Sequence, residues 1–202
     1  MKKIAAIFCT LIFSVSVLGQ NNITSIEIGS EIPMADLKMQ SVDRKELSLN
    51  DVKTNNGLLV MFSCNTCPVV IKSQARTKEM LAYAVEKGFG VAVVNSSEAK
   101  RNDAESLKAM IKYAKEQGYK VPYLVDAGSK LADAFGAART PEVFLFDGNG
   151  TLMYKGAMED NPTSPSESTQ LFLKNAIDQV LIGIMPDPAA TKSIGCAIKR
   201  IL

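Results

Sequence analysis

Two cysteines separated by two residues carry the strongest chemical signal in this chain. Cys64 and Cys67 form a CxxC motif that directly follows a continuous apolar run of strand length, residues 57–63. A helix is predicted to begin at or just after Cys64, with Pro68 in its first turn, where the missing N–H costs little. A thiol at a helix N-terminus meets the positive end of the helix dipole, which stabilises the thiolate and lowers its pKa. We therefore expect Cys64 to be nucleophilic and Cys67 to lie within bonding reach of it, as in a redox pair.

A CxxC pair has two other common uses, half of a zinc site and a structural disulfide. Zinc sites built on such a pair need a second pair or histidines. The chain has no histidine, and Cys196 is the only further cysteine outside the apolar N-terminal segment. A disulfide across two residues closes a very small loop and adds little stability. We therefore expect no metal and no cofactor other than a redox-active Cys64–Cys67 disulfide. A binding module with a fixed disulfide is the alternative.

Composition excludes several other classes of function. Without histidine the chain cannot use Ser-His-Asp or Cys-His catalysis, histidine-ligated zinc or copper, or histidine-ligated haem. Its 202 residues are 47% hydrophobic and 22% charged, which supports one packed domain. The chemistry therefore has to come from the cysteines.

The N-terminus has the layout of a secretory signal peptide. Lys2 and Lys3 precede an apolar or small run over residues 4–19, and cleavage would fall before Gln20. This run is shorter than the roughly 20 residues that a membrane span needs. We expect export across the inner membrane to the periplasm, with no stable membrane insertion after cleavage; an N-terminal membrane anchor is the alternative. Removing residues 1–19 leaves a formal charge of zero, which gives no electrostatic reason to expect a nucleic-acid partner.

The rest of the chain alternates strand-length apolar runs with helical patterns. Strands are predicted at residues 57–63, 89–94, 121–125, 142–146 and 152–155. Helices are predicted from the motif to residue 88, from Asn102 or Asp103 to 118, at 129–135, and along the stripe Phe172, Ala176, Val180 and Ile184. This succession predicts an α/β domain with some antiparallel sheet over residues 20–185, followed by a tail at 186–202 that carries Cys196.

A Thr-Pro pair and a hairpin turn add to the motif. Thr140 and Pro141 stand immediately before the strand at 142–146, and Asp-Gly-Asn-Gly at 147–150 is a strong hairpin turn. With the CxxC after the first core strand, this pattern resembles the thioredoxin superfamily. The lead-in at 28–33 resembles the secreted branch that holds TlpA-like and redoxin (AhpC/TSA-like) thiol–disulfide oxidoreductases. The resemblance spans about residues 27–185.

The resemblance implies a thioredoxin-like fold, a central mixed sheet flanked by helices. It implies that Cys64 attacks a substrate disulfide and that Cys67 resolves the mixed disulfide. It also places a cis proline at Pro141, so that the backbone of Thr140 binds an extended substrate segment beside the motif. The implied partners are protein thiols or disulfides of the envelope and a redox partner. A reductase, an oxidase and an isomerase would all fit such a motif.

Peroxiredoxins are the rival enzyme class in this superfamily. They resemble this chain in fold, but they place a threonine three residues before the peroxidatic cysteine and an arginine near the strand where this chain has Pro141. Here Met61 lies three residues before Cys64, and Cys64 itself lies three before Cys67. Arg76 or Arg139 could replace the missing arginine, and peroxide reduction therefore remains the alternative activity.

Many members of the superfamily also bury an acid near the second cysteine as a proton acceptor. No Asp or Glu occurs from Thr54 through Lys78. We therefore expect any such acid to come from a distant segment, such as Glu142.

Cys196 leaves one thiol unpaired whenever Cys64 and Cys67 are joined. In one hypothesis the tail folds back, so that Cys196 exchanges with the CxxC pair or links two chains. In the simpler one Cys196 is a free thiol, packed as a small hydrophobe by Ile194 and Ile198.

Overall fold

The computed structural model describes residues 24–201. The predicted signal peptide and Cys9 lie outside these residues. Within them, no helix is both long and apolar enough to cross a membrane.

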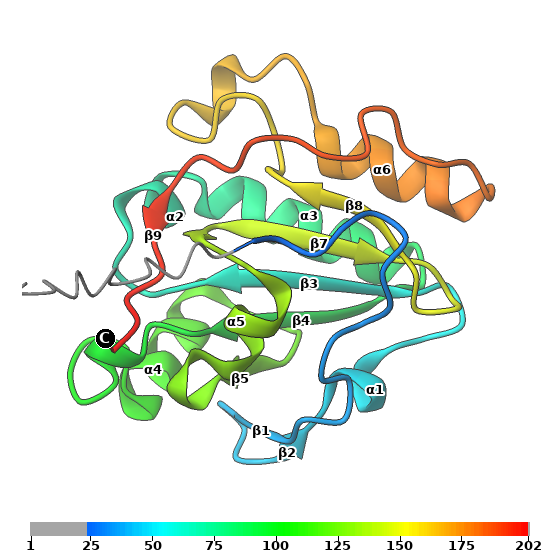
Figure 1. Ribbon diagram of the computed structural model, residues 1–202. Coiled ribbons are helices and arrows are strands. Elements are labelled where there is room, and N and C mark those ends of the chain that lie inside the picture. The colour runs from blue at the N-terminus through cyan, green and yellow to red at the C-terminus, as the bar shows by residue number, and fades with distance from the viewer. Residues whose placement is uncertain (1–23, 202) are drawn as a thin grey trace, which may run out of the picture.

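A mixed sheet of seven strands forms the centre of the molecule (Figure 1), in the order β2-β1-β5-β4-β3-β7-β8. β3 and β4 run parallel, as do β4 and β5, whereas β7 is antiparallel to both β3 and β8. The strands are β1 (Met39–Ser41), β2 (Glu46–Leu47), β3 (Leu58–Ser63), β4 (Gly90–Asn95), β5 (Tyr123–Val125), β7 (Glu142–Phe146) and β8 (Leu152–Gly156). The five strands predicted from apolar runs are thus confirmed, as is the hairpin turn between β7 and β8.

In the described part of the chain, six α-helices pack around this sheet. They are α1 (Leu49–Val52), α2 (Pro68–Lys72), α3 (Gln74–Glu86), α4 (Leu107–Gln117), α5 (Lys130–Phe135) and α6 (Phe172–Leu181), with short 3-10 turns at Glu98–Lys100, Ala127–Ser129 and Pro165–Glu167. Residues of β3 alternate between two buried clusters. Leu59 and Met61 pack with α3, α4 and α6, whereas Val60 and Phe62 pack with α1 and α5. Such burial on both faces explains why β3 is an unbroken apolar run.

Three helix boundaries differ from the prediction. The helix after the motif is interrupted at Ser73, whose hydroxyl donates to the Val69 carbonyl and ends α2 before α3 begins. α4 begins after Ser106, whose hydroxyl accepts from the Ala109 N–H, and not at Asn102 or Asp103. α6 ends at Leu181, so Ile184 is not on its buried stripe and is 51% exposed.

The C-terminal segment folds back onto the domain. In Figure 1 it runs in red from the end of α6 to the region where α2 begins. There β9 (Cys196–Ala197) pairs antiparallel with β6 (Arg139–Thr140), in a small sheet of its own. Ile198 is buried in the β3–α5 core, whereas Ile194 is 43% exposed, so only Ile198 fulfils the predicted packing role.

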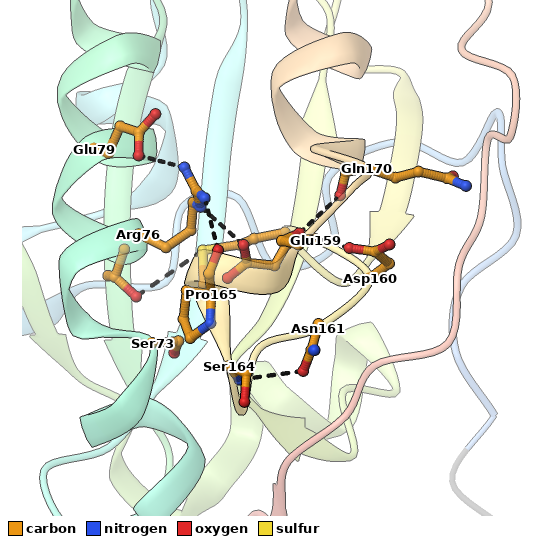
Figure 2. A network of polar contacts seen from close by, with 12 residues as sticks. Ser73, Arg76, Glu79, Glu159, Asp160, Asn161, Ser164, Pro165 and Gln170 are labelled. Carbon is orange, nitrogen blue, oxygen red and sulfur yellow. Dashed lines mark hydrogen bonds and ion pairs between the residues drawn. The ribbon is translucent and has the colours of Figure 1, made fainter.

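A buried ion pair fixes the loop between β8 and α6. Glu159 is fully buried, and its Oε2 accepts from Arg76 Nε of α3 at 2.8 Å. Figure 2 shows the Arg76 guanidinium between Glu159 and Glu79, with Nη2 also donating to the Pro165 carbonyl at 3.2 Å. Arg76 therefore ties the loop to α3 and compensates a carboxylate that has left water.

Replacing Arg76 with Met should destabilise the protein by about 3–5 kcal/mol, because the Glu159 carboxylate would be buried without its partner. Urea unfolding measures the change. Lys112→Met is the matched control: its exposed pair with Glu116, at 3.8 Å, should contribute less than about 1 kcal/mol. Equal effects of the two substitutions would contradict this account of Glu159.

Candidate active site

The N-terminus of α2 lies at Cys67. β3 ends at Ser63, four residues connect it to the helix, and α2 starts at Pro68 with Cys67 as its N-cap. Proline at the first helical position fits this start, because that position needs no N–H partner. The second cysteine of the motif, not the first, therefore occupies the helix N-terminus.

Three sulfurs meet beside Thr140. The Sγ atoms of Cys67 and Cys196 are 2.6 Å apart. Cys64 Sγ lies 3.3 Å from the Thr140 hydroxyl, and Cys67 Sγ, when protonated, donates to the Thr140 carbonyl at 3.3 Å. Cys64 and Cys67 are buried, Cys196 is half-buried, and all three are free thiols. The Thr140–Pro141 peptide bond is cis, as the family resemblance implies.

The hydrogen bonds favour a thiolate at Cys67. The Cys64 thiol donates to it and lowers its pKa most; the Cys196 thiol and the backbone N–H groups of Val70 and Cys196 lower it further, against the opposing effect of burial. The pKa of Cys64 is raised by the same bond to Cys67, by burial and by the negative charge of Glu105. The sequence predicts the lower pKa at Cys64, and titration of single-cysteine variants distinguishes the two assignments. α2 begins at Pro68, so Cys67 and not Cys64 is its N-cap.

Glu105 is the buried acid next to the motif. It is 1% exposed and accepts from the Asn65 N–H at 2.8 Å, the Thr66 hydroxyl at 2.7 Å and the Asn95 amide at 2.6 Å. It thereby fixes the loop between the two cysteines. The sequence predicts Glu142 as a candidate for this acid, but Glu142 accepts from the N–H groups of residues 138 and 139 and from the Ser193 hydroxyl. β3 and β4 run parallel and therefore end at the same edge of the sheet. An acid in the loop after β4, such as Glu105, can thus reach the motif that follows β3.

A cavity of about 260 Å³ opens onto the sulfurs, and its lining combines the motif, the loop after β4 and the C-terminal strand: Cys64, Thr66, Cys67, Pro68, Ser97, Lys100, Glu105, Cys196, Ala197 and Lys199. The cations at the cavity are lysines. The Arg76 guanidinium is held by Glu79 and Glu159, and Arg139 donates to the Gly195 carbonyl. Over residues 24–201, no group of three or more His, Cys, Asp or Glu side chains is placed to hold a metal.

Thr140 contacts both cysteines of the motif, but its strand edge is already occupied. The register of β6 and β9 sets Thr140 opposite Cys196 and Arg139 opposite Ala197. The position at which we expected an extended substrate segment to bind is therefore filled by the protein's own C-terminal strand.

The sequence of this chain is similar to those of known proteins. The family described as Redoxin matches residues 27–171. A curated relative, thiol-disulfide oxidoreductase ResA of Geobacillus thermodenitrificans, is 24% identical over 129 residues, which are 64% of this chain and 68% of the relative.

Two solved structures resemble the whole domain. The crystal structure of a hypothetical protein from Sinorhizobium meliloti has a TM-score of 0.80 at 32% identity, over 88% of this chain and 97% of that one. An uncharacterized conserved protein from Geobacillus kaustophilus has a TM-score of 0.80 at 30% identity, over 87% and 93% of the two chains.

Ultraviolet titration of the reduced protein should reveal one thiolate that persists far below the ordinary cysteine pKa of about 8.5. A lowered pKa means that the thiolate is present at neutral pH and is lost only as the pH falls through the lower value. In Cys67→Ser this acidic step should disappear. In Cys64→Ala it should shift to higher pH, because the strongest donor to the thiolate is gone. An acidic step that survives in Cys67→Ser would show that another cysteine holds the charge.

Proposed function

Because the chain belongs to the Redoxin family of the thioredoxin superfamily, we propose that it is a thiol–disulfide oxidoreductase that acts through Cys64 and Cys67 on disulfides of envelope proteins. The observation that carries the proposal is the placement of Cys64 and Cys67 beside Thr140, with Cys67 at the N-terminus of α2. The lowered pKa of Cys67, to which the hydrogen bond from the Cys64 thiol contributes most, supports it. A thiolate is the species that attacks a disulfide, and a neighbouring thiol can resolve the product.

In the proposed reaction, the Cys67 thiolate attacks one sulfur of a substrate disulfide. The S–S bond breaks, one substrate sulfur leaves as a thiolate that takes up a proton, and a mixed disulfide forms on Cys67. Cys64 then loses its proton and attacks Cys67 Sγ, which releases the second substrate thiol. One substrate disulfide is reduced to two thiols, while Cys64 and Cys67 are oxidised to a disulfide. The same steps in reverse would oxidise a dithiol.

The neighbouring residues support this division of roles. The raised pKa of Cys64 keeps it protonated while Cys67 is charged, so Cys64 donates to the nucleophile before it attacks. The Thr140 hydroxyl, at 3.3 Å, can donate to Cys64 Sγ as the Cys64 thiolate forms. Lys100 and Lys199 at the cavity favour thiolate forms of the leaving sulfurs.

Export through the N-terminal segment completes the proposal. A basic start followed by a short apolar run at residues 1–19 supports secretion to the periplasm, where disulfides persist and protein thiols are exchanged. Peroxide reduction is less well supported, because it needs an arginine at the reactive cysteine. The guanidinium groups of Arg76 and Arg139 are bound elsewhere and do not line the cavity.

Reduction of insulin disulfides with dithiothreitol as electron donor tests the proposal. Cys67→Ser should lose all catalysis, because no other sulfur occupies the helix N-terminus. Cys64→Ser should turn over more slowly, because Cys67 loses its partner in the motif. Cys64→Ser/Cys196→Ser, in which neither neighbouring thiol remains, should accumulate mixed disulfides at Cys67, which mass spectrometry detects. Circular dichroism should show these variants folded. Full activity of Cys67→Ser would refute the assignment, and an inert wild-type protein would favour a binding module with a fixed disulfide.

A further inference from the structure

Cys196 lies on the strand edge where the family resemblance predicts that an extended substrate segment binds. Strand β9 pairs with β6 at the edge beside the motif, with Cys196 opposite Thr140. Its sulfur lies 2.6 Å from Cys67 Sγ, only about half an ångström more than in a covalent disulfide (about 2.05 Å). The C-terminal strand thus presents a thiol to the proposed nucleophile in the manner of an extended peptide ligand.

The strand is held in place by contacts that do not involve sulfur. Arg139 donates to the Gly195 carbonyl at 2.9 Å, and the Ser193 hydroxyl donates to Glu142 at 3.1 Å. On the other side, Ile198 is 5% exposed, and Arg200 donates to the Asp133 carboxylate and the Ala137 carbonyl. The sulfur of Cys196 is therefore positioned on both flanks by the fold.

Gly195 shows how closely the tail approaches the motif. A Cβ at this position would lie 2.1 Å from the Thr140 carbonyl oxygen, so any side chain would push the strand away. Glycine is thus required at the residue next to Cys196, where the tail crosses the cis-proline loop.

We propose that Cys196 is a third redox thiol that forms a disulfide with Cys67, so that β9 is a built-in reaction partner of the CxxC motif. The inference rests on the proposed function, since it uses the same nucleophile. After Cys67 has formed a mixed disulfide with a substrate, Cys196 loses its proton and attacks Cys67 Sγ. The substrate leaves as a thiolate and is protonated, and a Cys67–Cys196 disulfide remains.

The disulfide can then move to the CxxC pair. Attack of the Cys64 thiolate on Cys67 Sγ forms Cys64–Cys67 and releases Cys196 as a thiolate that takes up a proton. Two protein thiols are oxidised for each substrate disulfide reduced, and an external dithiol restores the three thiols. While the disulfide is still Cys67–Cys196, Cys196 is its more exposed sulfur, so the dithiol attacks there and releases Cys67; after transfer, the dithiol has to attack the Cys64–Cys67 disulfide.

Peptide mapping distinguishes the two disulfides of Cys67. Trypsin releases residues 54–72, which hold Cys64 and Cys67, and residues 193–199, which hold Cys196. A Cys67–Cys196 disulfide links these peptides, whereas a Cys64–Cys67 disulfide leaves them separate. The full chain, with Cys9→Ser throughout, is oxidised with glutathione disulfide, quenched by alkylation and digested.

In Cys64→Ser we expect the linked peptides as the main oxidised product. In Cys64→Ser/Cys196→Ser, glutathione should stay on Cys67 at least roughly tenfold longer, because no intramolecular thiol displaces it. Gly195→Ala in the Cys64→Ser background keeps both sulfurs but should lower the yield of linked peptides, since the strand is displaced.

Glutathione that stays on Cys67 of Cys64→Ser beside a free Cys196 would overturn the inference. The proposed function would still stand if the wild-type protein formed Cys64–Cys67 and reduced insulin. Conversely, linked peptides in Cys64→Ser together with a wild-type protein that cannot reduce insulin would support the Cys67–Cys196 pair and refute the proposed function.

Discussion

The site depends on the stabilisation of one buried thiolate. Removing an uncompensated charge from water costs several kcal/mol, so a buried Cys67 thiolate persists only if hydrogen-bond donors surround it. These donors come from three separate segments: the Cys64 thiol from the motif loop, the Val70 N–H from α2, and the Cys196 thiol and N–H from the C-terminal strand. Low pKa at Cys67 is therefore a property of the assembled fold and not of the CxxC sequence.

Sheet topology brings these segments together. β3 and β4 are parallel, so the motif after β3 and Glu105 after β4 lie at the same edge. β7 is antiparallel to β3, so the start of β7, with Thr140 just before it, reaches that edge from the other direction. The buried acid, the cis-proline loop and the motif are thus placed by three central strands whose apolar runs are legible in the sequence.

Much of this could be predicted because it is encoded locally. The apolar runs predict the strands, the Asp-Gly-Asn-Gly turn predicts the hairpin, and the spacing of Cys64 and Cys67 predicts a reactive pair. The position of the helix start also had a local signal. Pro68 suits the first helical position, which would have made Cys67 the N-cap, but the two cysteines alone do not reveal which one caps the helix.

Long-range contacts escaped prediction for a physical reason. The place of Glu105 after β4 puts it at the edge of the sheet that carries the motif, but the sequence does not show which acid of that segment binds the loop at Asn65, 40 residues away. The pairing of Cys196 with Thr140 depends likewise on a chain that returns after α6. The tail sequence leaves two hypotheses for Cys196, an exchanging thiol and a packed one, and the packed thiol is the simpler; only the folded geometry sets its sulfur against Cys67.

Docking of the tail changes what a disulfide at Cys196 would do. A cross-link to a flexible tail would have to offset the entropy lost on closing a long loop. Here Ile198 and Arg200 already hold the tail on the domain without any sulfur contact. Forming or breaking a Cys67–Cys196 disulfide would then change few contacts between the tail and the domain. The equilibrium between the two thiols and the disulfide would depend on the reactivity of the sulfurs and not on ordering of the tail. Such a bond suits repeated exchange better than permanent stabilisation, and this is why we infer a redox role for the tail rather than a structural one.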